Sequence, residues 1–141
     1  MRKYFSFALG AVLLLLGGIA VVSQAQTQPR KHAPMYDPAT EVTVKGTIEE
    51  VKQVTGRHGW GGTHLILKTD AEALDVHVGP SWFLSREKME FAKGDEIEVV
   101  GSKITYQDAP ALLAREITKG EQKLTLRDAQ GIPVWARGHR K

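Results

Sequence analysis

The sequence of 141 residues predicts an all-β domain: an OB-fold-like five-stranded Greek-key barrel with one short helix and a C-terminal hairpin arm. Short runs of alternating apolar and polar residues recur between residues 41 and 127, as expected for strands with one buried face. Turn residues separate these runs. A single helical pattern falls between the third and fourth runs, the order of elements in an OB-fold. The alternative fold is another small β-sandwich or barrel.

The first 25 residues have the pattern of an export signal. Arg2 and Lys3 make the start positive, an apolar run from Phe7 to Val22 follows, and Ser23-Gln24-Ala25 offers small residues to a peptidase. We expect a signal-peptide helix that engages the membrane during export and is cut after Ala25, which places the mature chain in the periplasm. The alternative is an uncleaved anchor, because the apolar run approaches the ~18 residues needed to span a bilayer.

Removal of this signal changes the charge of the chain. The whole sequence has 19 Lys and Arg against 16 Asp and Glu, and Arg2 and Lys3 are the only charged residues before position 26. The mature part therefore has 17 basic and 16 acidic residues, a net charge of +1, which is little for a phosphate-binding surface. The sequence contains no cysteine, which excludes disulfides, thiolate zinc sites and covalent haem attachment.

The elements follow in order after the signal. Residues 26–40 contain three prolines and predict a linker. Residues 41–54 predict a long strand that bends at Gly46 and slips in alternation near Glu49 and Glu50. Residues 63–69 and 73–78 predict the next two strands, whose inward side chains are Leu65, Leu67, Leu74, Val76 and Val78.

The stretch at residues 79–91 predicts one to two helical turns, with Ser81 as the N-cap and with Trp82 and Phe83 closing one end of the barrel. Strands are predicted within 93–106, from residue 109 up to a turn at Lys119-Gly120, and at 123–127, followed by a turn and an apolar patch at 129–136. The barrel domain is therefore expected at 41–136, and residues 137–141 form a short basic tail.

Several segments together resemble one known family. They are "VKGTIEEV", "WGGTHLILKT", "VHVGPSWFL", "KGDEIEVVGS", "LLAREITKG" and "LTLRDAQGIPVW". These segments resemble small exported bacterial proteins that include the magnetosome protein MamS/MamX domain, over residues 41–135. The resemblance implies a periplasmic or membrane-facing location and no settled biochemical activity. Some relatives add a haem-binding cysteine motif, and this role does not carry over to a chain without cysteine.

The loop "TGRHGWGGTH" at residues 55–64 is the first candidate for ligand binding. The loop between the first two strands, with the outer face of strands two and three, commonly forms the ligand surface of an OB-fold. Trp60 could stack on a ring, and Arg57 and His58 could meet an anion. The alternative is that Trp60 folds back over one end of the barrel. The full set of expected ligand-binding residues is Arg57, His58, Trp60, His64, Lys68 and His77.

The hairpin of strands two and three yields a sharper prediction. If Leu65 lies opposite Val76 and Leu67 opposite Leu74, the same register places His64 opposite His77 on the outer face. Directly opposed β-carbons are roughly 4.5–5.5 Å apart, so the two imidazoles could share a transition metal. Asp75 on the diagonal and His58 in the loop could add ligands. The alternative is two half-exposed polar residues with no ligand.

Three functions follow from these features, and none is enzymatic because no spacing pairs a nucleophile with a base or two carboxylates with each other. The first is an exported binding or accessory module whose partner is an envelope protein, a peptide or a glycan, with no cofactor. The second, disfavoured by export and charge, is a single-stranded nucleic-acid-binding protein. The third is a metal-handling or redox-associated accessory protein that uses His64 and His77.

Overall fold

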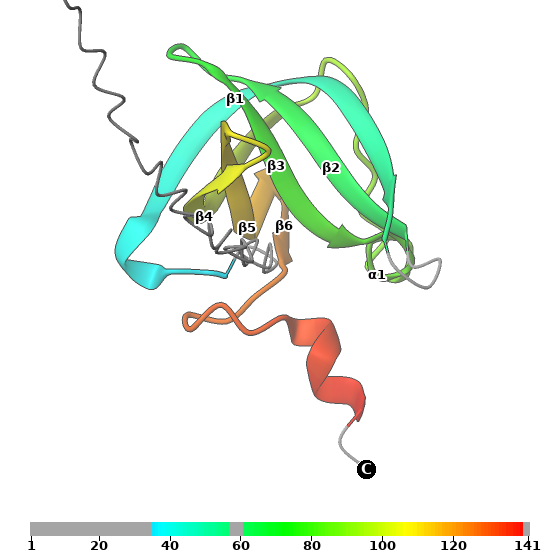
Figure 1. The fold of residues 1–141 in the computed structure, drawn as a ribbon. Coiled ribbons are helices and arrows are strands. Elements are labelled where there is room, and N and C mark those ends of the chain that lie inside the picture. Colours follow the sequence, from blue (N-terminus) through cyan, green and yellow to red (C-terminus); the bar gives the residue numbers. More distant parts are fainter. Residues whose placement is uncertain (1–34, 57–60, 140–141) are drawn as a thin grey trace, which may run out of the picture. The chain divides into compact units, whose positions relative to one another are not determined.

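Six strands form one antiparallel-rich sheet that curls into a barrel (Figure 1). The computed structural model describes residues 35–56 and 61–139. The described elements are a 3-10 helix η1 (Pro38–Thr40), strands β1 (Glu41–Thr55), β2 (Gly61–Lys68) and β3 (Ala73–Pro80), helix α1 (Ser81–Arg86), strands β4 (Glu96–Tyr106), β5 (Ala109–Lys119) and β6 (Gln122–Thr125), and a 3-10 helix η3 (Val134–His139). None of the helices described is long and apolar enough to cross a bilayer.

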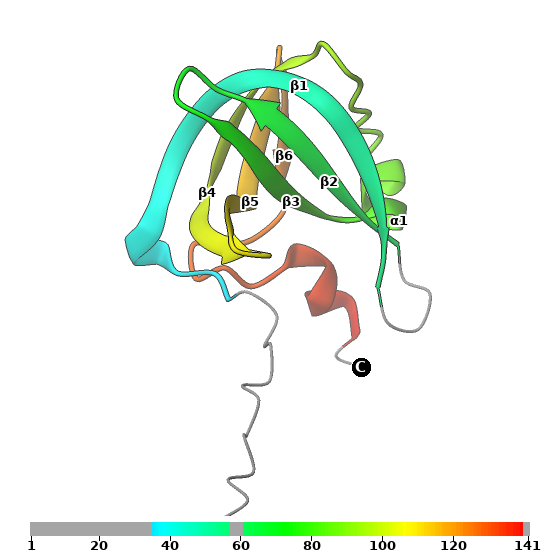
Figure 2. The ribbon, with the colours of Figure 1, turned by 45° about the horizontal axis from the view of Figure 1, so that its top comes forward.

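The order of pairing confirms the predicted OB-fold. The sheet runs β3-β2-β1-β4-β5-β6, and an additional parallel pairing of β3 with β5 closes the first five strands into a ring (Figure 2). Helix α1 lies between β3 and β4 in the chain, as predicted. Closure removes the two exposed edges that an open five-stranded sheet would have.

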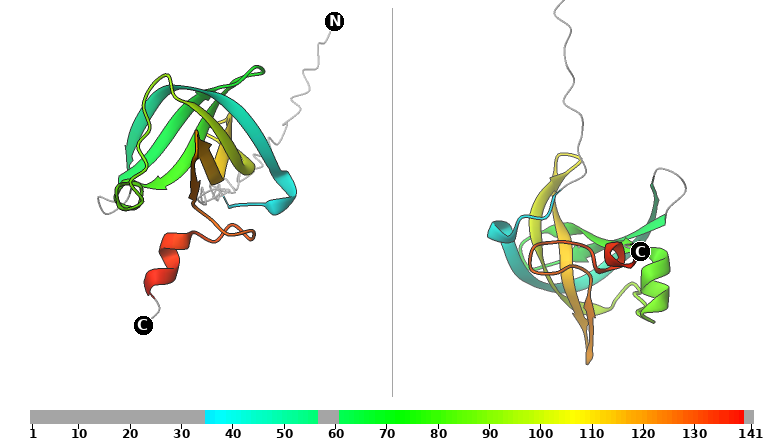
Figure 3. Two further views of the ribbon diagram at one scale, coloured as in Figure 1. Left: turned by 180° about the vertical axis from the view of Figure 1, so that it is seen from behind. Right: turned by 90° about the horizontal axis from the view of Figure 1, so that it is seen from below.

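Strand β1 bends, and it therefore pairs with two different strands of the barrel. Its first half pairs with β4 and its second half with β2, with an irregularity between Ile48 and Glu50 where the sequence predicts the slip. At Gly46 an added β-carbon would lie 2.3 Å from the carbonyl oxygen of Lys68, so only glycine allows β1 and β2 to approach this closely at the bend. Figure 3 shows β1 curving around the rest of the sheet.

The core consists of the inward side chains that the alternation predicts. Leu65, Leu67, Val76 and Val78 are fully buried, and Leu74 is 5 % exposed. The register of the hairpin is also as predicted, since Leu65 pairs with Val76 and Leu67 with Leu74. The alternation of β2 and β3 therefore determines which residues reach the outer face.

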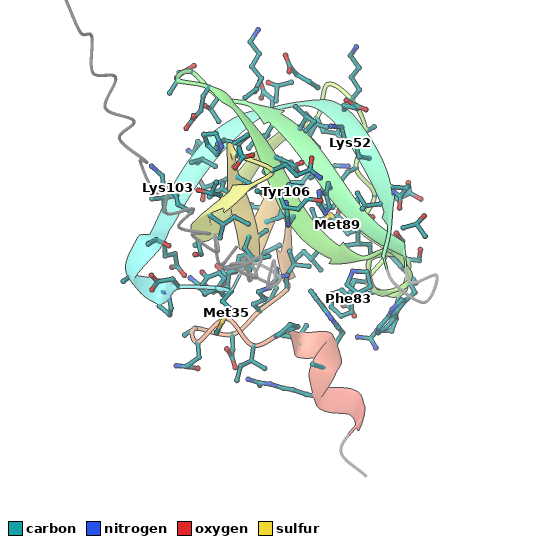
Figure 4. The ribbon with its side chains drawn as sticks, in the orientation of Figure 1. Met35, Lys52, Phe83, Met89, Lys103 and Tyr106 are labelled. Atoms are coloured by element: carbon teal, nitrogen blue, oxygen red, sulfur yellow. The ribbon has the colours of Figure 1, made fainter. Side chains whose placement is uncertain are left out.

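Helix α1 differs from its prediction in two details. Trp82 is 40 % exposed, while Phe83 and Leu84 are buried, so Phe83 alone of the predicted aromatic pair closes the barrel end (Figure 4). A helix of only six residues turns adjacent side chains about 100° apart, so both rings cannot face the core. Ser81 does not cap the helix; its hydroxyl donates instead to Gln53 Oε1 at 2.6 Å.

The barrel seam is completed by an arginine of the C-terminal arm. Strands β3 and β5 pair only from Asp75–Ala111 to His77–Leu113. Just beyond these pairs, Arg127 Nη1 donates to the carbonyl oxygens of Val78 on β3, at 3.3 Å, and of Ala114 on β5. The guanidinium is stacked against the Trp135 ring, with 5.2 Å from Cζ to the ring centroid. Arg127 therefore bridges two strands whose backbones no longer pair with each other.

The N-terminal segment before β1 is tied to the barrel. The Tyr36 hydroxyl donates to Glu41, which also accepts from Arg115 Nε at 2.8 Å and Nη2 at 2.9 Å. Gly131 packs against Tyr36 so closely that an added β-carbon would lie 2.3 Å from Tyr36 Cβ. Residues 35–40 of the expected linker thus contact both the barrel and the C-terminal arm.

The seam generates a prediction about stability. Replacing Arg127 by Met leaves two buried carbonyl oxygens without their donor, and each loss costs about 1–3 kcal/mol. We expect Arg127→Met to lower the free energy of unfolding by about 2–4 kcal/mol in urea denaturation. Arg86→Met is the matched control, because Arg86 is exposed and should change stability by less than about 0.5 kcal/mol. Equal stability of the two variants would contradict a bridging role for Arg127.

Candidate functional site

Two histidines face each other across β2 and β3, as the register predicts. His64 pairs with His77, and their rings are stacked with centroids 3.9 Å apart and an interplanar angle of 28°. The strand alternation that sends Leu65 and Val76 inward sends these two imidazoles to the outer wall of the barrel. The strands thus place two potential metal ligands or hydrogen-bonding groups in direct contact.

Asp75 joins the pair from the same face of β3. Its Oδ1 lies 2.9 Å from His64 Nδ1 and 3.7 Å from His77 Nε2. One donor atom from each of His64, Asp75 and His77 lies within 4.8 Å of the others. Asp75 and His77 share the outer face because they are two residues apart on one strand. The predicted diagonal carboxylate is therefore part of the cluster.

Tyr106, at the end of β4, covers the histidine pair. Its ring stands edge-on to His77 at 4.5 Å and to His64 at 5.8 Å between centroids. Figure 4 shows Tyr106 lying against the β2–β3 hairpin from the side of β4 and β5. The side chains of His64 and His77 are only 13 % and 11 % exposed, so the outer wall is more enclosed here than the sequence predicts. The sequence carries no signal for Tyr106, because β4 approaches the hairpin only through closure of the barrel.

Burial controls the charge of His77. Desolvation lowers the pKa of His77 to about 4, and the charges of His64 and Arg127 act in the same direction, while Asp75 opposes them. His77 is therefore neutral at neutral pH. Its Nε2 is buried and has no hydrogen-bond partner among the described residues.

A groove of about 560 Å³ opens beside the cluster. We call it the histidine groove. One wall is the β2–β3 hairpin with His64 and His77, and the other is formed by Met35 and Tyr36 of the N-terminal segment and by residues 130–133 of the C-terminal arm. Figure 4 shows Met35 next to this arm. Three segments that are distant in sequence therefore enclose one hollow.

Arg127 lies in the groove as its most buried charge. The residue is 7 % exposed, and no carboxylate lies within 4.0 Å of its guanidinium in the part of the chain that the structure describes. Burial lowers the pKa of Arg127 to about 10, which still leaves it charged at neutral pH. The lining of the groove thus combines one cation with two imidazoles, and the Asp75 carboxylate lies beside those imidazoles.

The remaining predicted ligand residues are not part of this cluster. Arg57, His58 and Trp60 lie outside the described residues. Lys68 is exposed at the far end of β2, pairs with Ala73, and lines a different hollow with Lys45 and Glu98. Of the six predicted residues, His64 and His77 are the two that the structure brings together.

The buried His77 makes stability depend on pH. Its pKa of about 4 in the folded protein lies below the ordinary 6.5, so the unfolded chain binds the proton first as the pH falls. The free energy of unfolding is therefore unaffected by His77 above about pH 6.5, and it falls as the pH is lowered from about 6.5 to about 4, because only the unfolded chain is protonated there. We expect the loss to be on the order of 2 kcal/mol in wild type and absent from His77→Phe, as measured by urea denaturation across this range. Parallel pH profiles of the two proteins would contradict the assignment.

Comparison with known proteins places the barrel in a family. The model of the MamS/MamX magnetosome protein family matches residues 40–124, which include β1 to β5, most of β6, and the cluster of His64, Asp75 and His77. The chain is 26 % identical over 123 residues to the magnetosome protein MamS of Paramagnetospirillum magneticum, covering 84 % of this chain and 68 % of that protein.

One solved structure is also similar, with a lower sequence identity. The N-terminal domain of the PriB protein from Thermoanaerobacter tencongensis superposes with a TM-score of 0.47 and 17 % identity, over 60 % of this chain and 99 % of that domain. The family match, in contrast, spans more than half of the sequence and reaches from β1 into β6. The chain belongs to the MamS/MamX magnetosome protein family.

Proposed function

We propose that this chain is an exported, non-enzymatic binding module of the MamS type that holds its ligand in the histidine groove. The observation that carries the proposal is the groove itself, about 560 Å³ between the hairpin and the two terminal segments, with His64 and His77 in one wall. Hollows of a few hundred Å³ with a small number of convergent polar groups are typical ligand sites. An envelope protein, a peptide or a glycan is the expected partner.

The polar groups of the groove support binding rather than catalysis. The two imidazoles contact each other and Asp75, and among residues 35–56 and 61–139 neither bonds a hydroxyl that could act as a nucleophile. The Ser81 hydroxyl is hydrogen-bonded to Gln53 and to Thr63, and no imidazole of the described residues bonds it. A nucleophile needs an adjacent base to be activated at neutral pH. These contacts favour the non-enzymatic reading.

The nucleic-acid alternative receives less support. This alternative would use Trp60 to stack on bases and Arg57, Lys68 and the basic tail to contact phosphates, but Lys68 does not line the groove. A mature charge of +1 also offers little attraction for a polyanion. Retention on heparin or single-stranded DNA that falls steeply with salt would be needed to revive this alternative.

Export is supported by the first 25 residues together with the family assignment. A positive start, an apolar run and the sequence Ser23-Gln24-Ala25 fit a cleaved signal. We expect protein isolated from the periplasm of cells that express the full chain to begin at Gln26, as measured by N-terminal sequencing and intact mass. Recovery of a membrane-bound chain that retains Met1 would support an uncleaved anchor instead.

A groove-filling substitution tests the binding function. Gly62 lines the groove on the same face as His64, and an added β-carbon would meet only the carbonyl oxygens of Val54 and Gly79, at 3.8 and 3.9 Å. Gly62→Leu should therefore be tolerated by the backbone and still occupy the groove. We expect it to lose the molecules that co-purify with tagged, cross-linked wild-type chain from the host envelope, as identified by mass spectrometry.

Gly61→Leu is the matched control for this experiment. Gly61 is the neighbouring residue, is exposed, and does not line the groove. The control should retain the wild-type set of co-purifying molecules, and circular dichroism should show that both variants are folded. The same set in all three proteins would contradict ligand binding in the groove.

A further inference from the structure

We propose that His64, Asp75 and His77 form a binding site for one divalent transition-metal ion, which presents an open coordination position to the histidine groove. This inference rests on the groove as the proposed site of function and names the chemistry of its ligand. It assigns a shared role to three side chains on the outer wall of the barrel, from two adjacent strands.

The distances between the three side chains fit a common ion. Ligand atoms that bind zinc at about 2.0–2.2 Å lie roughly 3–3.5 Å from one another. Asp75 Oδ1 is already 2.9 Å from His64 Nδ1, and it is 3.7 Å from His77 Nε2. Small rotations of the side chains would therefore suffice, and an ion would take the place of the proton that His64 and Asp75 share.

One nitrogen of the cluster, His77 Nε2, makes no hydrogen bond with any described residue. His77 Nε2 is buried without a hydrogen-bond partner among the described residues, and an unsatisfied buried polar atom costs about 1–3 kcal/mol. The stacked rings and the edge-on Tyr106 account for the packing of the imidazoles. They do not account for an unpaired nitrogen that lies beside a carboxylate. A metal ion would satisfy both groups.

The charges around the cluster affect how tightly an ion would bind. Asp75 supplies a negative charge that compensates part of the charge of a dication. Arg127, which lowers the pKa of His77 through its charge, opposes the ion. We therefore expect binding to be weaker than at a structural zinc site with four ligands.

The donor set also selects the class of metal. Two imidazoles and one carboxylate suit Zn²⁺, Cu²⁺, Ni²⁺ or Fe²⁺, whereas Mg²⁺ and Ca²⁺ prefer oxygen ligands. Three protein ligands leave at least one position of a four-coordinate ion unfilled by the cluster. Because His64 and His77 line the groove, that position is available to water or to a donor atom of a groove ligand.

Calorimetric titration tests the site directly. Protein produced from the full-length gene and stripped with EDTA should bind about one Zn²⁺ or Co²⁺ per chain, with an increase in melting temperature, and should show no comparable heat with Mg²⁺. The double variant His64→Ala, His77→Ala should lose the binding. Asp75→Asn, which preserves the shape of the side chain, should weaken it at least about tenfold.

Matched controls separate this site from general metal binding. Asp70→Asn removes an exposed carboxylate of the β2–β3 turn, and His139→Ala removes a histidine of the C-terminal segment. Both should bind zinc as wild type does. The proposal is overturned if wild type binds no Zn²⁺ or Co²⁺ at millimolar concentration, or if the double variant, folded by circular dichroism, binds as wild type does.

The two proposals can fail separately. If zinc does not bind but Gly62→Leu still loses its co-purifying molecules, the groove functions without a metal and the metal proposal is wrong. If zinc binds through His64 and His77 but Gly62→Leu behaves as wild type, the metal site is real and the groove is not the ligand site. Loss of zinc-dependent co-purification in both Gly62→Leu and the double variant would support both proposals.

Discussion

The closure of β3 against β5 is the constraint on which the rest of this structure depends. The two strands share only a short parallel ladder, from Asp75–Ala111 to His77–Leu113. Arg127 extends that contact by donating to carbonyl oxygens on both strands where the ladder has ended. A buried guanidinium is costly to desolvate, and here hydrogen bonds and the Trp135 ring offset that cost. The same contact holds the C-terminal arm beside the hairpin, which creates one wall of the histidine groove.

The site depends on this closure as much as on its own residues. The β2–β3 hairpin aligns His64 with His77, but Tyr106 reaches them only because β5, which pairs with the end of β4, also pairs with β3 in the closed ring. Enclosure by Tyr106 and the terminal segments removes water from the imidazoles, and this desolvation is the main cause of the lowered pKa of His77. His77 therefore becomes a neutral imidazole whose Nε2 has no hydrogen-bond partner among the described residues.

The family match and the groove coincide only in part. The MamS/MamX match at residues 40–124 contains the histidines, Asp75 and Tyr106, whereas Tyr36, Arg127 and the segment at 130–133 lie outside it. The barrel and its cluster therefore belong to the region that identifies the family. The opposite wall of the groove comes from the two flanking segments, which Gly131 and Tyr36 hold in close contact. Differences in these flanks among family members would change the groove while leaving the barrel intact.

The sequence by itself determined the features that depend on local periodicity. Alternation in β2 and β3 predicts the buried leucines and valines, the register, and hence the pairing of His64 with His77; the bend at Gly46 and the helix between β3 and β4 also follow from local patterns. Only the tertiary structure decided that Tyr106 covers the pair, that Arg127 bridges the seam, that Lys68 stands apart, and that Trp82 remains exposed. The contacts of Tyr106 and Arg127 join residues far apart in the chain at the parallel β3–β5 pairing. The alternation within a strand specifies which face a side chain occupies, and it contains no information about which distant strand will lie against that face.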